Sequence, residues 1–583
     1  MLAGQWRRSA VNIAATACVL MMSMTASGPG NAQQTTPQPQ RDPRQTEKSF
    51  EAFEAEQRRA KRATIRLPSA AKPEAPVDTK PLFKLTGVSV TGAHAVSGDA
   101  IAGVYRSYIG KTVSQADLVT IAGKVSDLYR DAGYHLSRAI IPPQDIKGGR
   151  IRIRVIEGKI AEIVLKGERA ELFGIRPMLD PVTAEHPSQL KTLERQLLLV
   201  NNRPGVRVAD TALEEIGQTT GRFRLILHLE TWRIFTALAL DNRGTPSVGP
   251  LQAYWSSMLN SSLVVGDALG LNLSTIPDAT RELGFSRLFY DMPIGIDGAR
   301  LGANASYSEL WPSGEKGLLN TRTRIETYEL KGSIVPLQSR KSSLLLTAAA
   351  SMSNNSESNS LGANYRDQIR TVSLTADYQL QDDLAGWNYL SLTLRQGVNV
   401  LGASDSGDAL LSRSDGTGNF SKLEFSYTRY QKLSDIWSLK LSAAGQVAST
   451  AMLASQEFYL GGIAFGRGYD GGELSGDNGI AGSLELRFDQ TLDHDFFKGY
   501  QLYSFFDKGA VWNFRDGKDD FFSLSSAGAG IRLYLASELQ AGMEIAVPLD
   551  FRSPANEDRN PRVFFFLSKS FKLCPGSIHM RCS

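Results

Sequence analysis

The chain has 583 residues, which is more than one ordinary domain holds, so several folding units are expected. Its formal charge is only +4, and that balance argues against a nucleic-acid binder, which would carry a concentrated basic face. Glycine (53 residues) and tyrosine (18 residues) are abundant, as in an exported β-protein. We therefore expect a multidomain chain that is rich in strands.

The first 32 residues have the pattern of an export signal. Arg7 and Arg8 precede an apolar stretch over residues 10–26, and Gly30-Asn31-Ala32 has the small-x-small spacing of a cleavage site. The alternative is an uncleaved anchor helix, but polar residues dilute the stretch. We expect residues 1–32 to be a signal peptide.

Residues 33–81 have the composition of a linker, with Gln-Pro repeats first and a proline-rich run last. Within them, residues 46–63 have the charge pattern of a helix, acidic early and basic late, as the helix dipole favours. The apolar face of this helix is thin, with Phe50 and Phe53 as its main members. It is either a solvated helix or a plug in a polar cavity.

Residues 82–157 have the pattern of a small α+β domain. Alternation of polar and apolar residues predicts strands over residues 83–90 and 149–156, the latter with its arginines on one face. Helical spacing predicts a helix over residues 116–132, which Gly133 ends.

The same order recurs in residues 158–231, with strands expected over 160–165 and 222–229 and a helix over 190–199. Two consecutive copies of one unit are an internal repeat. Each copy can bury one sheet face under its helices, and its edge strands can then accept an extended peptide. The alternative is that both units are rigid spacers.

From residue 232 to residue 571 no helical period persists. Segments of about ten residues alternate apolar and polar side chains, as the strands of a membrane barrel do. A soluble sandwich or a β-solenoid is the alternative, but charges recur on the polar face and the segments have no fixed period. The count is roughly sixteen strands, which begin near residues 232, 250, 266, 281, 299, 324, 340, 369, 387, 419, 435, 479, 500, 526, 538 and 562.

A Gly-rich run over residues 461–479 joins the eleventh and twelfth of these strands. It contains Arg467-Gly468-Tyr469, an arginine with so little bulk around it that it could enter a narrow space. A carboxylate that could receive it is Asp507, in the run Phe505-Phe506-Asp507-Lys508-Gly509. The alternative is a surface loop with a solvated arginine.

Three cysteines and six histidines are present. Cys18 would leave with the signal, whereas Cys574 and Cys582 remain in an oxidising compartment, either as a disulfide or as two free thiols. The chain has no phosphate-binding loop, no His-Glu-x-x-His motif and no metal-like histidine cluster. We therefore expect no enzyme activity, no cofactor and no metal.

These segments, in this order, resemble the two-partner secretion transporters, the TpsB family, which includes the haemolysin secretion/activation proteins of the ShlB/FhaC/HecB type. The first small unit resembles the POTRA domain of that family at Gly133-Tyr134, Pro142-Pro143-Gln144 and Glu157-Gly158. The remaining fragments of the resemblance are residues 193–199 and 203–208 in the second unit and Asp241-Asn242-Arg243-Gly244 after the first barrel strand.

The resemblance implies a transmembrane β-barrel of about 16 antiparallel strands, preceded by two POTRA-type domains over residues 82–157 and 158–231. It implies that the loop folds back into the barrel, where Arg467 meets Asp507 between Phe505 and Gly509. Glu485 is a second candidate partner. Gly466 stands where the family usually has valine, so a more mobile tip is expected.

The resemblance also implies a function and partners. The chain would be an outer-membrane pore that takes an unfolded, β-helical exoprotein from the periplasm and moves it to the cell surface without nucleotide hydrolysis. Besides this exoprotein, its partners would be outer-membrane lipid and, during biogenesis, the barrel assembly machinery. The helix over residues 46–63 would plug the barrel. Phe571 would be the terminal aromatic, followed by an unusual tail over residues 572–583. A barrel-insertion factor of the same superfamily and a passive porin or receptor are the alternatives.

Overall fold

The computed structural model describes residues 78–217, 220–245, 248–514, 521–550 and 559–573. The predicted signal peptide, the predicted helix over residues 46–63, Cys574 and Cys582 lie outside the described residues. So does most of the predicted tail over residues 572–583, but its first two residues belong to the last strand of the barrel, which ends at Leu573. Across the described ranges, no helix has both the length and the apolar character that a membrane crossing requires.

The first domain packs two helices on a three-stranded sheet in which β2 runs parallel to β5. Ile121 and Val125 of the longer helix face Ile151 and Ile153 of the central strand in its buried core. The elements of this domain are β1 (Pro81–Lys84), β2 (Gly87–Thr91), α3 (Gly98–Tyr105), a 3-10 turn (Arg106–Tyr108), β3 (Thr112–Ser114), α4 (Gln115–Asp131), β4 (Arg138–Ile140) and β5 (Arg150–Ile156).

Local sequence explains the limits of α4. The Ser114 side chain accepts the N–H of Asp117, and the Asp117 carboxylate accepts the N–H of Ser114, so a capping box begins the helix. Gly133, with φ of +90°, follows the last turn in the left-handed region that glycine tolerates.

The prediction of one strand over residues 83–90 is wrong. The segment contains two short strands in different sheets, because β1 pairs with β3 whereas β2 pairs with β5. Between them Leu85 is fully buried, and its N–H donates to the carbonyl of Lys111. Each strand alternates by itself, but the inward apolar positions shift from Phe83 and Leu85 to Val88 and Val90, so the phase of the pattern changes where the strand partner changes.

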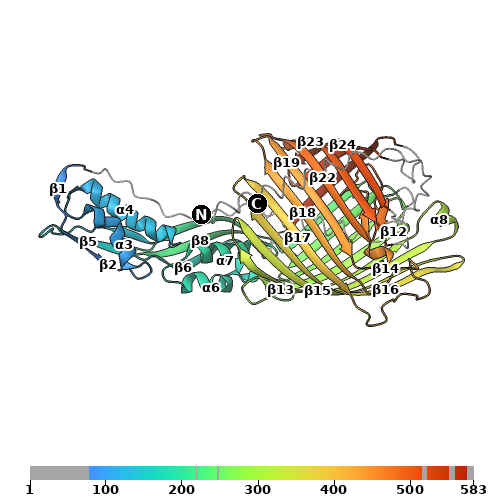
Figure 1. The fold of residues 1–583 in the computed structure, drawn as a ribbon, viewed down its shortest axis with the longest axis horizontal. Helices are drawn as coiled ribbons and strands as arrows, with labels where there is room; N and C mark the ends of the chain where they lie inside the picture. The colour runs from blue at the N-terminus through green and yellow to red at the C-terminus, as the bar shows by residue number, and fades with distance from the viewer. Residues whose placement is uncertain (1–77, 218–219, 246–247, 515–520, 551–558, 574–583) are drawn as a thin grey trace. The chain divides into compact units, whose positions relative to one another are not determined.

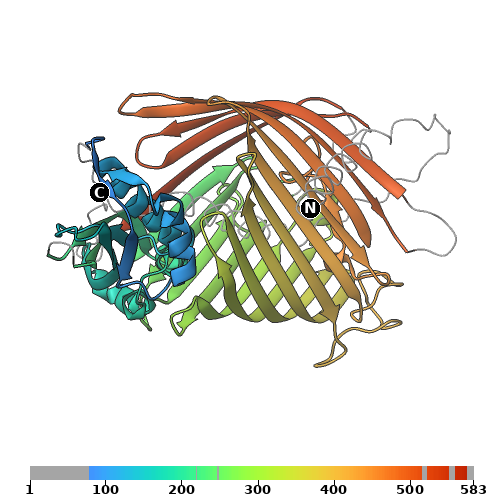
Figure 2. The ribbon, with the colours of Figure 1, turned by 60° about the vertical axis from the view of Figure 1, so that its left-hand side comes forward.

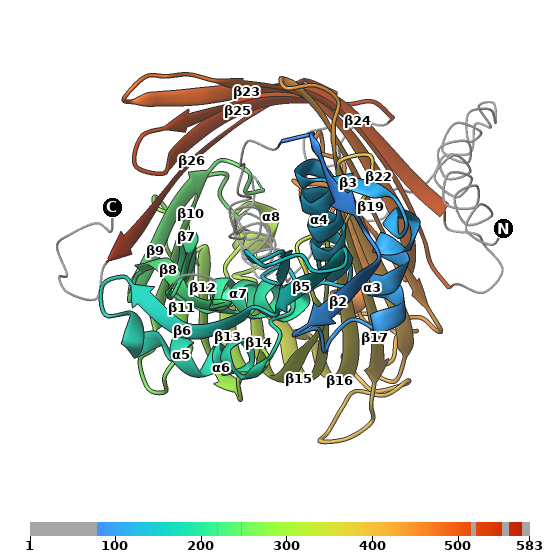
Figure 3. The same cartoon turned by 90° about the vertical axis from the view of Figure 1, so that its left-hand side faces the viewer.

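The second domain has a sheet of order β6-β8-β7, in which β6 and β8 are parallel. Its core joins Leu193 and Leu197 of the main helix to Leu225 and Leu227 of the central strand. The strand β7 was not predicted. The elements are β6 (Lys159–Lys166), a 3-10 turn (Ala170–Phe173), α5 (Ile175–Met178), α6 (Asp180–Ala184), α7 (Leu190–Asn202), β7 (Val206–Glu215) and β8 (Arg222–Thr231). Figure 3 shows the helices and sheets of both domains.

Sixteen antiparallel strands of the described residues close into a barrel (Figures 1 and 2), which confirms the predicted fold class. The largest difference from the predicted starts is at β16, which begins at Gly362 rather than near residue 369. The first eight strands are β9 (Ile234–Asp241), β10 (Gln252–Asn260), β11 (Ala268–Thr275), β12 (Leu283–Ile294), β13 (Ala299–Leu310), β14 (Arg322–Gln338), β15 (Ser342–Asn359) and β16 (Gly362–Gln381).

The barrel closes where β26 pairs with β9, from Phe566 opposite Asp241 to Leu573 opposite Ile234 (Figure 3). A short helix, α8 (Glu315–Leu318), lies between β13 and β14. The remaining strands are β17 (Gly386–Gly397), β18 (Ser421–Lys432), β19 (Trp437–Ala448), β22 (Asn478–Thr491), β23 (Phe497–Trp512), β24 (Phe521–Leu535), β25 (Leu539–Pro548) and β26 (Arg562–Leu573).

Strand β23 shows how alternation divides the wall into two faces. Leu502 and Phe506 are 44% and 46% exposed on the outer face, whereas Tyr503, Phe505 and Asp507 are buried on the inner face. An aromatic-rich strand therefore still has one apolar face for lipid and one face for the lumen.

The loop between β19 and β22 lies against the inner face of the wall. It contains a 3-10 turn (Ala454–Gln456) and a small hairpin of β20 (Phe458–Leu460) and β21 (Leu474–Gly476). Leu460 and Tyr469 of this loop share a buried apolar cluster with Val511 and Leu524 of the wall. We call residues 449–477 the arginine loop, because Arg467 lies near its tip.

Candidate functional site

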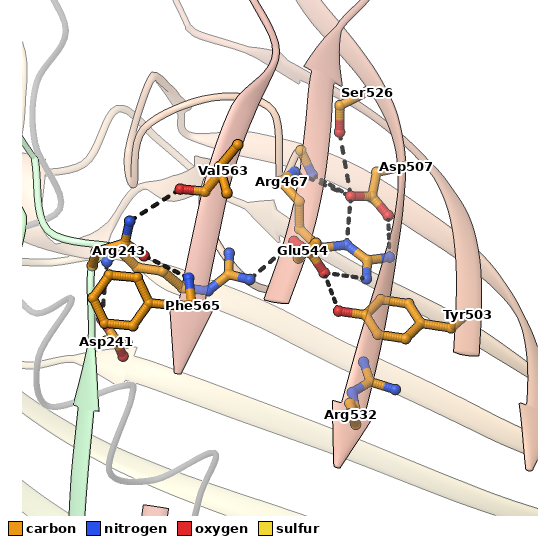
Figure 4. Close-up of polar contacts among 12 residues, drawn as sticks. Asp241, Arg243, Arg467, Tyr503, Asp507, Ser526, Arg532, Glu544, Val563 and Phe565 are labelled. Carbon is orange, nitrogen blue, oxygen red and sulfur yellow. Dashed lines mark hydrogen bonds and ion pairs between the residues drawn. The ribbon is translucent and has the colours of Figure 1, made fainter. Parts of the chain in front are cut away.

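Arg467 meets a buried carboxylate on the barrel wall (Figure 4). Its Nε and Nη2 atoms donate to the two carboxylate oxygens of Asp507, each at 3.0 Å. The backbone N–H groups of Gly466 and Arg467 donate to the same carboxylate, at 3.2 and 3.1 Å, and the Ser526 hydroxyl does so at 3.3 Å. Asp507 is fully buried and Arg467 is 6% exposed. This is a bidentate pair whose extra hydrogen bonds offset part of its desolvation cost.

The tip reaches the wall because it has almost no side-chain bulk. A Cβ on Gly468 would lie 2.7 Å from the backbone nitrogen of Pro548 and 2.8 Å from the carbonyl carbon of Val547. Gly466 has φ of +82°, and its carbonyl accepts the N–H of Tyr469 at 2.9 Å, which closes a turn. Valine, which the family resemblance leads us to expect at position 466, would be strained in this left-handed conformation.

Phe505 and Gly509, on either side of Asp507, contact the arginine loop in different ways. The guanidinium carbon of Arg467 lies 3.4 Å from the centroid of the Phe505 ring, as in a cation–π contact. A Cβ on Gly509 would lie 2.7 Å from Leu460, so the missing side chain lets the hairpin approach the wall.

Glu485 also accepts a hydrogen bond from Nη1 of Arg467, at 2.8 Å. The other carboxylate oxygen of Glu485 accepts from Arg487 at 2.7 Å and from Arg532 at 3.0 Å. Ser483, two residues earlier on the same strand, accepts from Nη2 of Arg467 at 3.1 Å. Glu485 therefore belongs to a cluster of three arginines rather than to Arg467 alone.

A third carboxylate, Glu544 of β25, was not singled out from the sequence. One of its oxygens accepts the Tyr503 hydroxyl at 2.9 Å and lies 3.5 Å from Nη1 of Arg467. The other oxygen accepts from Arg243 at 2.9 Å. Figure 4 shows Glu544 between the arginine loop on one side and Arg243 on the other.

The three carboxylates differ in how far they depend on Arg467. Glu485 keeps two other arginines, and Glu544 keeps Arg243. In the part of the chain that the structure describes, Arg467 is the only cation that pairs with Asp507. Departure of the loop would leave Asp507 as a buried charge without a counter-charge, which is energetically costly.

Arg243 connects this site to the closing seam of the barrel. The side-chain amide of Asn242 donates to the carbonyl of Val563 at 3.0 Å and accepts the N–H of Phe565 at 2.8 Å. The amide thus continues the pairing of β9 with β26 beyond the end of the backbone register. The arginine loop, Glu544 and the seam form one polar network.

Glu157 of the first domain holds three segments together. One of its oxygens accepts the N–H groups of His94 and Ala95, each at 2.7 Å, and the hydroxyl of Tyr129 at 2.8 Å. Burial raises the pKa of this carboxyl, but the N–H groups of Ala95 and His94 and the Tyr129 hydroxyl outweigh that effect, so the pKa of Glu157 is lowered.

Gln144 extends the sheet of the first domain. Its side-chain amide donates to the carbonyl of Arg152 at 3.0 Å and accepts the N–H of the same residue at 2.7 Å. Pro142 and Pro143, which precede Gln144, have no N–H for strand pairing, so the Gln144 side chain covers the edge of β5 after β4 ends.

The remaining residues of the POTRA-type motif are turn and packing residues. Tyr134 follows Gly133 and places its ring 6.0 Å from the ring of Tyr129. A Cβ on Gly158 would lie 2.3 Å from the carbonyl oxygen of Leu136, and the Gly158 carbonyl accepts the N–H of Ser188. These residues shape the turns and the packing of the domains.

Several members of the site were not predicted from the sequence, although alternation along the strands indicates some of them. Residues two positions apart on a barrel strand share a face, so Asp507 implies Tyr503, and Glu485 implies Ser483 and Arg487. Contacts between different segments gave no such signal, and they bring in Ser526 and Arg532 of β24, Glu544 of β25 and Arg243, which follows β9. Within the described ranges, no group of three or more His, Cys, Asp or Glu residues could hold a metal ion.

Two known transporters are similar to most of the chain. Heme/hemopexin transporter protein HuxB of Haemophilus influenzae is 26% identical over 485 residues, which cover 80% of this chain and 84% of the relative. Outer membrane transporter CdiB of Dickeya dadantii is 24% identical over 462 residues, which cover 76% and 79%.

Two solved structures share the fold. CdiB from Escherichia coli has a TM-score of 0.70 at 19% identity and covers 91% of this chain and 98% of its own. CdiB from Acinetobacter baumannii has a TM-score of 0.62 at 19% identity, with coverage of 90% and 98%.

Two family profiles match the chain itself. The POTRA domain, ShlB-type, matches residues 83–158, and the haemolysin secretion/activation protein ShlB/FhaC/HecB family matches residues 228–533, just over half of the chain. The resemblance inferred from the sequence is confirmed. The chain belongs to the haemolysin secretion/activation protein family ShlB/FhaC/HecB, the two-partner secretion transporters, which are outer-membrane pores with POTRA domains in the periplasm.

Proposed function

We propose that the arginine loop is the gate of this secretion pore. In the resting pore the loop lies in the lumen with Arg467 on Asp507. An unfolded exoprotein that enters from the periplasm displaces the tip, passes outward along the lumen and folds on the cell surface. The observation that carries this proposal is the buried Arg467–Asp507 pair.

The pair suits a gate because it is specific and reversible. A bidentate arginine–carboxylate contact fixes one orientation of the tip. Its net stability is modest, because the attraction only partly exceeds the cost of removing both charges from water. Water admitted with the exoprotein would solvate both groups, and the unpaired charge on Asp507 would favour return of the loop afterwards.

The topology supports an opening of this loop toward the cell surface. Strand β9 follows the two periplasmic domains directly, so odd-numbered strands of the barrel run outward. The arginine loop follows β19, the eleventh strand, and therefore connects strands at the outer end. An exoprotein released past the tip would leave the barrel on the correct side.

The POTRA domains would supply the recognition step. A partner with unpaired backbone groups can add a strand to an exposed sheet edge, which gives affinity without a reaction. In this proposal the chain is not an enzyme and binds neither a nucleotide nor a cofactor, and folding of the exoprotein outside the cell prevents its return. The cargo is a secreted exoprotein, as expected for a relative of HuxB and CdiB. Outer-membrane lipid and the barrel assembly machinery are the further proposed partners.

Exchange of Arg467 for alanine tests the gate. Secretion of the exoprotein should fall at least about tenfold, since breaking a buried pair costs a few kcal/mol, while the barrel still resists unfolding by detergent at room temperature. Arg395→Ala, which removes a wall pair with Glu424, is the matched control. Unchanged secretion by the Arg467→Ala variant would remove the loop from the mechanism.

Deletion of the whole protein distinguishes a secretion pore from a barrel-insertion factor. In a secretion pore, one exoprotein should accumulate in the periplasm while the other outer-membrane barrels keep their normal amounts. A general loss of barrels would favour the insertion factor instead.

A further inference from the structure

A second buried arginine lies near the base of the arginine loop. Arg413 belongs to the connection between β17 and β18, residues 398–420, and is 8% exposed. Its Nη1 atom donates to Glu457 at 2.6 Å and to Asp477 at 2.7 Å. Its Nε and Nη2 atoms donate to the two carboxylate oxygens of Asp415, at 3.0 and 2.9 Å, within its own connection.

The two acceptors in the arginine loop stand at the ends of the hairpin that carries the tip. Glu457 directly precedes β20, and Asp477 directly follows β21. One guanidinium therefore joins both ends of the segment from residue 457 to residue 477, with Arg467 midway between them. Glu457 and Asp477 are buried, so the shared cation also offsets the repulsion between two neighbouring anions.

Asp477 is held in place independently of Arg413. One of its oxygens accepts the N–H of Met452 at 2.8 Å, and the other accepts the N–H of Phe514 at 3.0 Å. Its own N–H donates to the side chain of Asn513 at 3.1 Å. Arg413 therefore attaches the other end of the hairpin, at Glu457, to Asp477, which is fixed at the outer end of the wall.

Further contacts join the same two loops. The N–H of Ala454 donates to the Ser412 hydroxyl at 3.0 Å, and Thr417 forms a bridge with Met452. Leu411 packs against a buried cluster that includes Met452 and Leu453. Arg413 is therefore surrounded by further contacts between its own connection and the arginine loop.

We propose that Arg413 is a positioning residue for secretion, which clamps the base of the arginine loop so that the tip can leave Asp507 and return to it. The inference rests on the proposed gate. Without the clamp, Glu457 and Asp477 would repel each other, the hairpin would spread, and Arg467 would return to Asp507 less often. The cycle would slow although every residue of the tip site is intact.

The test uses the full-length protein, in planar bilayers for channel openings and in cells for secretion. Arg413→Ala should lengthen the mean open time and lower secretion, each by at least about fivefold, the lower end of ordinary coupling between sites. Arg413→Lys keeps the charge but cannot reach three carboxylates with a fixed fork, so its effect should be intermediate. Arg429→Ala is the matched control, because Arg429 pairs with Asp382 in a turn at the opposite end of the barrel.

A second substitution separates the clamp from a simple loss of packing. Glu457→Gln in the Arg413→Ala background removes the repulsion with Asp477 and should restore the open time to within about twofold of wild type. A wild-type open time and wild-type secretion in the Arg413→Ala variant would overturn the proposal, and so would failure of Glu457→Gln to restore the open time. If Arg413→Ala does not assemble, the same criteria apply to Arg413→Lys.

The experiments distinguish failure of the proposed clamp from failure of the proposed gate. If Arg467→Ala leaves secretion unchanged, the proposed gate is wrong whatever Arg413 does. If Arg467→Ala abolishes secretion while the Arg413 variants behave as wild type, only the clamp is wrong.

Discussion

At the scale of single residues, Asp507 is the member of the site that depends most on Arg467. Asp507→Asn keeps the shape but removes the charge and one acceptor, so the guanidinium loses its bidentate partner. Loss of one partner from a buried pair costs about 3–5 kcal/mol. We expect the tip to leave its site, and a cysteine at exposed position 464 of the loop should then react faster with a membrane-impermeant maleimide on whole cells.

Glu485→Gln is the matched control for this prediction. Glu485 contacts Arg467 as well, but Arg487 and Arg532 hold it too, so its loss changes the tip contact less. Labelling at position 464 should rise less than in the Asp507→Asn variant. Equal labelling in both variants would show that Asp507 has no special part in holding the tip.

At the scale of elements, Glu157 joins the end of β5 to the segment after β2 and to α4. Its pKa is lowered in the folded domain, so its contribution to stability is present above the ordinary value of 4.5 and is lost as the pH falls through the lower, folded value. We expect Glu157→Gln to lower the local free energy of opening by about 1 kcal/mol at pH 7, since the group is partly exposed and screened.

Amide hydrogen exchange at His94 and Ala95 measures this effect. Protection relative to the intrinsic rate should fall in the Glu157→Gln variant at pH 7 and should fall in wild type only at acidic pH. Asp127→Asn, which removes an exposed pair with Arg130 on α4, is the control. Wild-type protection in the Glu157→Gln variant would contradict the anchoring role.

The elements also show what the sequence could and could not predict. Barrel strands follow from alternation, because lipid on one side and water on the other impose a period of two on each strand. A single strand was predicted over residues 83–90, although the apolar positions shift by one residue between Leu85 and Val88, where the chain passes from one sheet to another. Alternation also gave no account of Arg413, because that residue lies in an irregular connection and two of its three carboxylate partners, Glu457 and Asp477, belong to another loop.

The residues of the site also divide into those that the sequence predicts and those that it does not. Arg467 and Asp507 could be paired from their motifs, and Glu485 could be added as a candidate. Glu544 could not, because it lies on β25, two strands away from Asp507, and its contacts with Tyr503 and Arg467 depend on the pairing of β23, β24 and β25 and on the fold of the loop. Contacts that depend on closure, such as those of Arg243 at the seam, have no local pattern in the chain.

At the scale of the whole molecule, recognition in the periplasm requires a sheet edge that the chain itself leaves open. In the first domain, the order β2-β5-β4 makes β2 and β4 the edges, but β4 has only three residues and the N–H of its Ala139 already donates to the Ser126 hydroxyl of α4. Strand β2 pairs only with β5 among the described residues. We therefore expect the exoprotein to add its strand to β2, since strand addition needs unpaired backbone groups.

Site-specific photo-cross-linking tests this expectation. A photoreactive residue in place of Ser89, in the middle of β2, should give a cross-link to the exoprotein while it waits in the periplasm of cells that carry the Arg467→Ala variant. The same residue in place of Thr120, exposed on α4 of the same domain, should give at least about fivefold less product, because strand addition is confined to the edge. Equal cross-linking at both positions, or cross-linking confined to the second domain, would place recognition elsewhere and leave the first domain as a spacer.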